Sequence, residues 1–459
     1  MLLRLKKFAL TFAILFVLAS IFVANVCAGE LIDYSNSLVR VGIYYSTTAL
    51  KSVDISNSGG FSIFVSEDSY EPVLIDVSML SVDVKNGALS ISTVFGSELA
   101  SSAAGAKIYV YSANPDDTIT VNDTSYYGGL EMYVNENGKI VVINAVSIDD
   151  YLKGVLPSEV YPSWNMEALK AAAIVSRTYA LRNAVNSSHQ SDGFDICATT
   201  HCQMYTGRTK ENERTNQAIS ETEGFVVMYG EELAMTPYHS SNGGYTETAS
   251  GAWGGSKDTY PYLINVFTPY EDYRNVPNGK WENIVLPAEL YKHIPENYRK
   301  TLTGNNYSFE ITRALSGFNE KMTVKDEFGN KLTLSTSGAV RGFFGDLVKS
   351  ANFGIANTYV PSDNVSGSIT VITAQGTQEI TGINSYEYIT AEGRYTCAGF
   401  KNVYVFDGQG YGHGVGLSQF GSRCMADAGF TYDEIILTYF PGTDIISIYD
   451  LFTEPETEF

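Results

Sequence analysis

Positive charge is scarce in this sequence. Lysine and arginine together number 30 against 51 aspartates and glutamates, which gives a net charge of −21 at pH 7. A field of that sign repels the phosphates of nucleic acids and the headgroups of anionic lipids. The charge balance therefore argues against nucleic-acid binding as a function.

Cysteine is scarce as well, with 5 residues in a chain of 459, so a small scaffold held together by disulfides is excluded. Hydrophobic residues make up 44% of the chain and tyrosines alone number 32, which excludes a disordered protein. At roughly 150 residues per domain, the length leaves room for two or three domains. We expect a folded chain with a sizeable core.

The N-terminus holds a long hydrophobic run, from Phe8 to Val26, preceded by Arg4, Lys6 and Lys7. Small residues follow near Ala28, as at a signal-peptidase site. The run is also close to the about 20 residues that span a bilayer. Two interpretations of residues 1–28 stay open: a cleaved signal peptide, or a retained membrane anchor over residues 8–26. Both place the protein outside the cytoplasm, in the cell envelope or secreted.

Residues 29–127 are predicted to form a β-rich N-terminal region. Short alternating runs such as Leu38–Tyr44 and Lys107–Tyr111 are separated by glycine, serine, asparagine and aspartate. Further along, Asn137-Gly138 lies between two apolar runs, and Asn-Gly accepts the positive φ of hairpin turns. That pattern predicts a hairpin at the start of the next domain.

One long helix is predicted over about 165–185, because Asn165 can cap it, Glu167 suits its first turn, and alanine and leucine dominate. A stripe of small residues on one face predicts close packing on a sheet. Short helices are predicted near 286–296 and 432–440. The expected class is α+β: a mostly antiparallel catalytic domain over 128–445 follows the β-rich region, and an acidic tail occupies 446–459.

Glu159 is the strongest candidate for acid–base chemistry. It lies between Pro157 and Pro162, in a segment that we expect to be a fixed loop ahead of the long helix. Apolar neighbours such as Trp164 disfavour the carboxylate and would raise its pKa toward the range of a general acid. An ordinary exposed loop acid, or a residue that caps the helix, remains the alternative.

A second candidate is a group of cysteines and histidines, consisting of His189, Cys197, His201 and Cys202. Two thiolates and two imidazoles are the ligand types that tetrahedral zinc prefers. A Cys197–Cys202 disulfide is the alternative, because export exposes the chain to oxidation. The residues alone leave both readings open.

Two glycine-containing loops complete the set of candidate sites. Residues 238–246 combine short hydrogen-bonding side chains with glycines that let a ligand approach the backbone, as sugar hydroxyls require, although a plain Asn-Gly turn explains the same residues. Residues 408–421 hold six glycines. Candidate binding residues are Tyr238, Ser240, Ser241 and Asn242 in the first loop and Gln409, Tyr411, His413, Ser418 and Gln419 in the second.

Three segments together resemble the stage II sporulation protein D (SpoIID)/LytB family of bacterial cell-wall proteins. They are YLKGVLPSEVYPSWNMEALKAAAIVSRTYAL (151–181), YHSSNGGYTE (238–247) and GQGYGHGVGLSQFGS (408–422), in family order. The resemblance covers roughly 130–445 and includes a diverged segment at 340–355. This chain departs from the usual family sequence at Val160, where methionine is common, but it keeps the glutamate at position 159.

The resemblance implies a peptidoglycan lytic transglycosylase that cuts the bond between N-acetylmuramic acid (MurNAc) and N-acetylglucosamine (GlcNAc). The family assigns catalysis to the glutamate that is Glu159 here. As an acid it protonates the leaving oxygen, and as a base it deprotonates the 6-hydroxyl of MurNAc, which closes a 1,6-anhydro ring. A role in sporulation is implied by the family name alone.

The resemblance also bears on the other candidates. Some family members carry a zinc site of cysteine and histidine near this point, which favours structural Zn²⁺ on Cys197, His201, Cys202 and His189 over the disulfide. The glycine-rich loop is implied to line the glycan cleft, where His413 either stabilises charge or acts as a structural hydrogen-bond donor. Related LytB proteins stimulate an N-acetylmuramoyl-L-alanine amidase, so a non-catalytic glycan binder with an amidase partner is the rival function.

Overall fold

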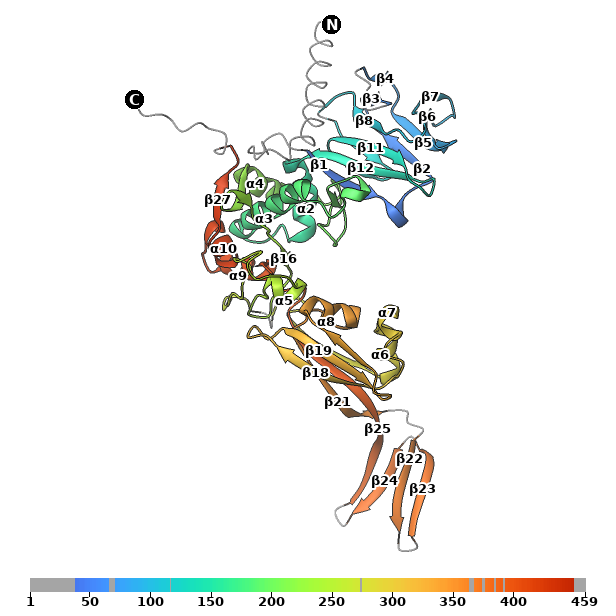
Figure 1. Ribbon diagram of the computed structural model, residues 1–459, viewed down its shortest axis with the longest axis vertical. Coiled ribbons are helices and arrows are strands. Elements are labelled where there is room, and N and C mark those ends of the chain that lie inside the picture. Colours follow the sequence, from blue (N-terminus) through green and yellow to red (C-terminus); the bar gives the residue numbers. More distant parts are fainter. Residues whose placement is uncertain are drawn as a thin grey trace, which may run out of the picture. The chain divides into compact units, whose positions relative to one another are not determined.

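The computed structural model describes residues 38–65, 71–115, 117–272, 275–362, 367–373, 376–383, 385–390 and 393–449 (Figure 1). The chain divides into two compact units. Unit 1 comprises Met1–Pro237 and Ala426–Phe459, and unit 2 comprises Tyr238–Met425. Both boundaries fall inside the region 128–445. The predicted signal or anchor, residues 1–28, lies outside the described residues.

Two large sheets and a smaller one form the β part of unit 1. In the first sheet the order is β13 (Ile196–Cys197), β1 (Leu38–Tyr44), β12 (Ile140–Ser147), β11 (Gly129–Val134), β8 (Ile108–Ser112), β3 (Phe61–Phe64) and β4 (Val73–Ile75). In the second it is β10 (Thr124–Tyr126), β9 (Ile119–Val121), β2 (Ser52–Ser56), β5 (Met79–Lys85), β6 (Ala88–Thr93) and β7 (Glu98–Ser101). The third orders β15 (Glu232–Leu233), β14 (Phe225–Tyr229) and β27 (Asp444–Ser447).

The predicted hairpin is confirmed as β11 and β12, which pair antiparallel with Val134 opposite Ile140. Asn135 Oδ1 accepts hydrogen bonds from the backbone N–H groups of Asn137 and Lys139, and Gly138 takes a φ of 66°. The turn therefore uses the positive φ that glycine adopts without strain. Strand β27 includes Ile446 and Ser447, so the segment assigned to the acidic tail begins inside a strand, and from residue 450 it lies outside the described residues.

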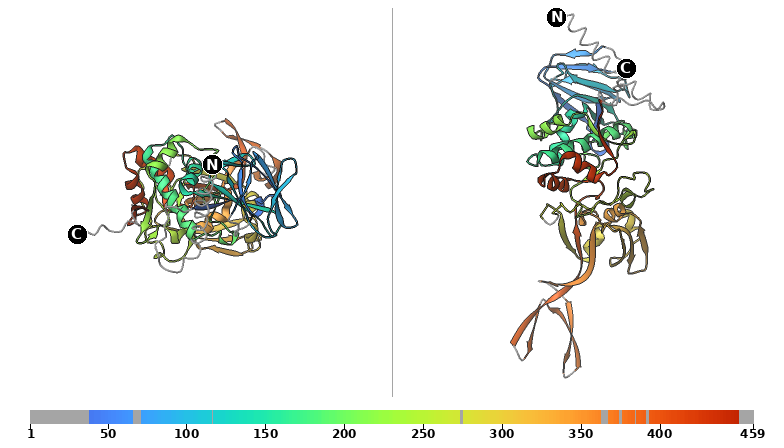
Figure 2. Two further views of the ribbon diagram at one scale, coloured as in Figure 1. Left: turned by 90° about the horizontal axis from the view of Figure 1, so that it is seen from above. Right: turned by 90° about the vertical axis from the view of Figure 1, so that its left-hand side faces the viewer.

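The helices of unit 1 lie side by side although they come from distant parts of the chain (Figure 2). They are α2 (Ile148–Glu159), α3 (Met166–Val185), α4 (Glu213–Glu221) and α10 (Tyr432–Tyr439), with α9 (Gln419–Asp427) at the boundary. Helix α3 contacts α2, α4 and α10 as well as β14. Helix α3 therefore packs on a sheet, as predicted, but also on other helices. Small residues occur around most of its circumference, so neighbouring helices can approach it closely as well.

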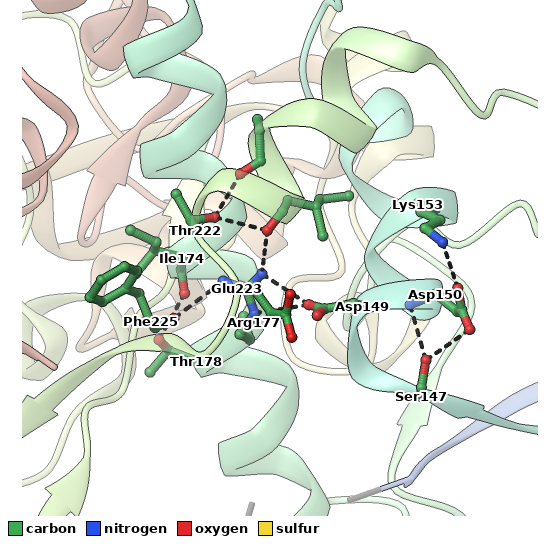
Figure 3. Close-up of polar contacts among 12 residues, drawn as sticks. Ser147, Asp149, Asp150, Lys153, Ile174, Arg177, Thr178, Thr222, Glu223 and Phe225 are labelled. Atoms are coloured by element: carbon green, nitrogen blue, oxygen red, sulfur yellow. Dashed lines mark hydrogen bonds and ion pairs between the residues drawn. The ribbon is translucent and has the colours of Figure 1, made fainter. Parts of the chain in front are cut away.

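A buried arginine holds these helices together. Arg177 of α3 is fully buried and donates to Asp149 of α2, with a shortest distance of 2.9 Å, and to the carbonyl of Phe225 at 3.2 Å (Figure 3). It also donates to the Ile219 carbonyl of α4 at 3.2 Å. A guanidinium offers five donors in a rigid plane, so one side chain reaches two helices and a strand.

Unit 2 also combines antiparallel sheets with short helices. The strands are β17 (Lys280–Val285), β25 (Gly393–Gln409) and β21 (Phe353–Ser362), with β24 (Ser385–Thr390) on β25; β18 (Tyr307–Arg313), β19 (Asn319–Asp326) and β20 (Lys331–Leu334); and β22 (Gly367–Thr373) with β23 (Gly376–Ile383). The helices are α5 (Ala249–Trp253), α6 (Pro287–His293), α7 (Glu296–Arg299) and α8 (Ser337–Phe344). The α+β class with mainly antiparallel sheets is confirmed.

Within the described ranges, no helix is both long enough and apolar enough to cross a membrane.

Candidate functional site

Glu159 is the last residue of helix α2, so the prediction that it lies in a loop is wrong. Ser147 caps the helix by accepting a hydrogen bond from the Asp150 N–H at 3.2 Å. Pro157 lies in the last turns of α2, where its missing N–H costs a single hydrogen bond. The two prolines thus suggested a loop, but only Pro162 lies beyond the helix.

The carboxylate of Glu159 is half-buried, and its Oε1 accepts a hydrogen bond from the backbone N–H of Met204 at 2.9 Å. The segment around Met204 is itself fixed to α2. The hydroxyl of Tyr151 donates to Gln203 Oε1 at 3.0 Å, and the hydroxyls of Ser158 and Thr206 are 3.1 Å apart. Contacts on both sides of Met204 therefore hold the donor that orients the carboxylate.

Gly154 allows this segment to lie against the helix. A Cβ atom at this position would lie 2.5 Å from the carbonyl oxygen of Gly207 and 2.6 Å from the ring of Tyr205. Any larger residue would push the segment away from α2. The close approach that positions Met204 therefore depends on a glycine.

The four predicted metal ligands come together in unit 1. Their ligand atoms all lie within 4.8 Å of one another. His201 Nδ1 is 3.3 Å from His189 Nε2, 3.3 Å from Cys202 Sγ and 3.7 Å from Cys197 Sγ. Bonds of about 2.0–2.1 Å to nitrogen and 2.3 Å to sulfur put the ligand atoms of tetrahedral zinc about 3.3–3.8 Å apart. The residues present therefore fit a zinc ion.

The surroundings of this cluster also suit a metal. Asp192 Oδ2 lies 2.9 Å from His189 Nδ1, the arrangement in which a carboxylate orients a metal-binding imidazole. Both cysteines are free thiols, and hydrogen bonds from Cys202 and Thr199 lower the pKa of the Cys197 thiol. Cys202 is followed by Gln203 and then by Met204, so the same segment carries the cluster and the donor to Glu159.

In unit 2 the two glycine-containing loops lie together. Strand β16 (Tyr238–His239) pairs parallel with β26 (Leu417–Ser418), and Ser241 and Tyr411 exchange backbone hydrogen bonds of 2.8 and 3.1 Å. The motifs 238–247 and 408–422, which are far apart in sequence, thus lie against each other. This juxtaposition gives the candidate binding residues a common location.

A buried carboxylate accepts hydrogen bonds from several of those residues. Glu271 is 4% exposed and accepts hydrogen bonds from the hydroxyls of Ser241 and Ser418, the latter at 2.5 Å. It also accepts the backbone N–H of Asn242 at 3.2 Å. Because Ser241, Ser418 and Asn242 are buried and bonded internally, they hold the two loops together. Tyr411 is exposed, whereas Tyr238, Ser240, Gln409 and Gln419 are half-buried.

His413 is a neutral hydrogen-bonding residue in this structure. Its Nδ1 accepts from the Val415 N–H at 3.0 Å, and its ring also bonds the backbone of Tyr238. Burial lowers the pKa of His413 to about 4, so the ring carries no charge at neutral pH. His239 beside it is buried, which also lowers its pKa, and its Nδ1 lies 3.1 Å from the Val415 carbonyl. Of the two roles left open for His413, these contacts favour the structural one.

Sequence reasoning missed Glu271 and Glu247. Glu247 belongs to the motif 238–247, so the motif itself was a signal, whereas nothing around Glu271 marks it. Glu247 is fully buried, its Oε1 accepts from the Thr248 N–H at 2.7 Å, and its Oε2 has no hydrogen-bond partner among the described residues. Burial raises the pKa of Glu247 to about 7.

Glu247 gives unit 2 a pH-dependent stability. A carboxyl group whose pKa is raised in the folded state stabilises the fold below its unfolded pKa, and this contribution is lost as the pH rises through about 7. The shift corresponds to a loss of about 3 kcal/mol between pH 4.5 and pH 8. We therefore expect Glu247→Gln to unfold at higher urea than wild type at pH 8, with little difference at pH 4.5. Equal pH dependence in both proteins would contradict this assignment.

Comparisons with known proteins match the part of unit 1 in which these candidate residues lie. The family described as Stage II sporulation protein matches residues 136–229, the part of the chain that holds Glu159 and the Cys/His cluster. An uncharacterized protein of Brachyspira hyodysenteriae is 29% identical over 330 residues, which is 72% of this chain and 74% of that protein.

Two relatives from Bacillus subtilis (strain 168) carry functional names. An amidase enhancer is 30% identical over 311 residues, 64% of this chain but only 40% of the enhancer's length. Stage II sporulation protein D is 24% identical over 316 residues, 66% of this chain and 75% of that protein. The motifs stand in the same order, and Glu159 lies inside the matched domain, so the resemblance of this chain to the SpoIID/LytB family is confirmed.

Proposed function

We propose that this protein is a peptidoglycan lytic transglycosylase that cleaves the bond between MurNAc and GlcNAc and leaves 1,6-anhydro-MurNAc ends. The observation that carries the proposal is the fixed carboxylate of Glu159, which ends helix α2, is half-buried, and is oriented by the Met204 N–H at 2.9 Å. A side chain held in this way reaches a bound glycan in a single orientation, as proton transfer requires.

The reaction needs one acid–base group. Glu159 donates its proton to the glycosidic oxygen while the bond from that oxygen to C1 of MurNAc breaks and positive charge develops on the sugar. The resulting carboxylate then takes the proton of the 6-hydroxyl of the same MurNAc, whose oxygen bonds to C1. The proton returns to Glu159, no water is consumed, and the enzyme is ready for the next cycle.

The substrate places this activity in the cell wall, and we propose that residues 1–28 direct the chain there, either as a signal peptide or as an anchor over residues 8–26. The family name and the B. subtilis relative that shares it connect this family with sporulation. We propose cell-wall remodelling of that kind, with glycan strands as the partner that the protein must recognise.

A zinc ion on His189, Cys197, His201 and Cys202 would have a structural role. Four protein ligands leave no open position for a water molecule or a substrate, so the ion would supply rigidity and not Lewis-acid chemistry at the glycan. The segment that it would fix also contains Met204, which donates to Glu159. We propose that the metal site acts as a positioning element for the catalytic carboxylate.

Removing this metal should destabilise the protein. We expect about one zinc per chain by elemental analysis, and a lower melting temperature after chelation or in the Cys202→Ser variant. Cys424→Ser, which removes a cysteine outside the cluster, should keep both the zinc and the melting temperature. Absence of zinc, together with a bond between the Cys197 and Cys202 peptides in mass spectrometry of the non-reduced protein, would instead establish the Cys197–Cys202 disulfide.

The amidase enhancer of B. subtilis supports a second candidate function. A protein that binds glycan and stimulates a cell-wall amidase would need the same fold without the chemistry at Glu159. The two candidates differ in what the purified protein does alone.

The deciding experiment incubates the chain from Gly29 onward with purified glycan strands, with and without peptide stems. Mass spectrometry then detects anhydro ends. Anhydro products without added amidase support the transglycosylase. Binding without products, together with faster release of peptides when an amidase is added, would support the enhancer.

A further inference from the structure

Arg341 of helix α8 is half-buried and has no partner among the residues that the structure describes. Among the described residues, the structure gives its guanidinium no hydrogen-bond acceptor and no ion pair. Two other arginines of this chain have partners: Arg40 pairs with Glu131 at 2.7 Å, and Arg313 donates to the Phe353 carbonyl at 2.9 Å. None of its nitrogens is among the buried polar atoms that lack a partner, so the guanidinium donors remain accessible to an acidic group of a ligand.

The groups that face Arg341 do not neutralise it. It acts electrostatically on His239 and His413, and both imidazoles are kept neutral because burial lowers their pKa values. Tyr411 and Asp346 are the acidic groups near it, but Asp346 is exposed and does not form an ion pair with it. Burial lowers the pKa of Arg341 itself, although a guanidinium stays charged at neutral pH. Within the described part of unit 2, no ion pair therefore compensates the positive charge of Arg341.

Exposed aromatic rings and a second cation lie at the same place. Trp253 is 45% exposed, and its ring centroid is 5.4 Å from that of His413. Tyr411 is 38% exposed, and Lys349 Nζ lies 5.4 Å from the centre of its ring. In a chain of net charge −21, this combination is a local basic spot. Exposed aromatic faces beside a charged fork suit a ligand with both an apolar face and an acidic group.

We propose that Arg341 binds a carboxylate of the ligand, with Trp253 and Tyr411 contacting the sugar rings that carry it. The inference rests on the proposed function for the identity of the polymer, and it names the acidic group that unit 2 recognises. Two carboxylates of peptidoglycan have this chemistry: the lactyl carboxylate of a MurNAc residue without a peptide, and the terminal carboxylate of a peptide stem. Arg341 forms two parallel hydrogen bonds with either one.

The test measures binding by calorimetry to the full chain carrying Glu159→Gln, so that no ligand is consumed. The three ligands are tetrasaccharides of alternating GlcNAc and MurNAc. One has free lactyl carboxylates, one has lactyl methylamides, and one has lactyl groups joined to peptide stems. Adding Arg341→Gln should weaken binding of a carboxylate ligand roughly 10- to 100-fold and leave the methylamide ligand unchanged. The ligand that responds identifies which carboxylate is bound.

Lys331→Gln is the matched control, because it removes one exposed positive charge from the same unit. It should bind all three ligands as the parent does, and Arg341→Gln should keep the parent's melting temperature or raise it. If both carboxylate ligands bind the Arg341→Gln protein as well as the control, the inference is overturned while the proposed function stands. If the parent binds none of the ligands, both are overturned.

Discussion

Replacing Glu159 by glutamine should lower the rate at which 1,6-anhydro ends form on glycan strands roughly 10²- to 10⁴-fold. Glutamine has the size of glutamate, and its oxygen can still accept the Met204 N–H that orients the wild-type carboxylate at 2.9 Å. It can neither donate a proton to the glycosidic oxygen nor accept one from the 6-hydroxyl. The loss therefore falls on the chemical step and not on the fold, and initial rates from mass spectrometry measure it.

Glu136→Gln provides the control for this substitution, because Glu136 is an exposed acid in the turn between β11 and β12. That variant should keep the wild-type rate. Unchanged melting temperature and glycan binding in Glu159→Gln would locate its defect in catalysis. If Glu159→Gln cleaves glycan at the wild-type rate, Glu159 is not the acid–base group and the proposed mechanism fails.

The largest effect on stability should come from Arg177→Ala, with a loss of about 3–5 kcal/mol in the free energy of unfolding. The substitution removes a fully buried side chain and leaves Asp149 and the carbonyls of Ile219 and Phe225 without their donor (Figure 3). It also opens a cavity between α3 and its neighbours. Urea unfolding followed by circular dichroism measures the difference.

Arg208→Ala tests whether burial is the reason for the large loss of stability expected from Arg177→Ala. Arg208 also pairs with a carboxylate, Glu211 at 2.7 Å, but its side chain is 41% exposed. Its removal should cost at most about 1 kcal/mol, because exposed ion pairs are screened by water. Equal losses in the two variants would show that the buried contacts of Arg177 contribute no more than a surface pair.

The parts of the fold that depend on local sequence could be predicted. The hairpin of β11 and β12 follows from Asn137-Gly138, and helix α3 has its predicted cap at Asn165, which accepts the Glu167 N–H at 3.1 Å. Helix α2 was missed because Pro157 suggested a loop, although a proline near a helix end removes only one hydrogen bond. Local sequence signals thus predict that a helix or hairpin exists better than they predict the residue at which it ends.

The site was predictable only where its residues are close in sequence. The Cys/His cluster spans a short segment, and the structure brings all four predicted ligands together. Glu271 instead receives hydrogen bonds from Ser241 and Ser418, which are 30 and 147 residues away. Arg341 stands out because no described residue is its partner, and this follows only from the positions of the side chains around it. Roles of this kind arise from tertiary contacts that no sequence pattern records.

The central claim is that Glu159 catalyses attack on C1 of MurNAc by the 6-hydroxyl of the same MurNAc, and that water does not take part. Cleavage of glycan strands by the wild-type protein in H₂¹⁸O, followed by mass spectrometry of the new ends, tests this claim most directly. The account predicts anhydro ends that carry no ¹⁸O, and far fewer of these products with Glu159→Gln. Reducing ends labelled with ¹⁸O would contradict it, because they would show that water attacks the sugar.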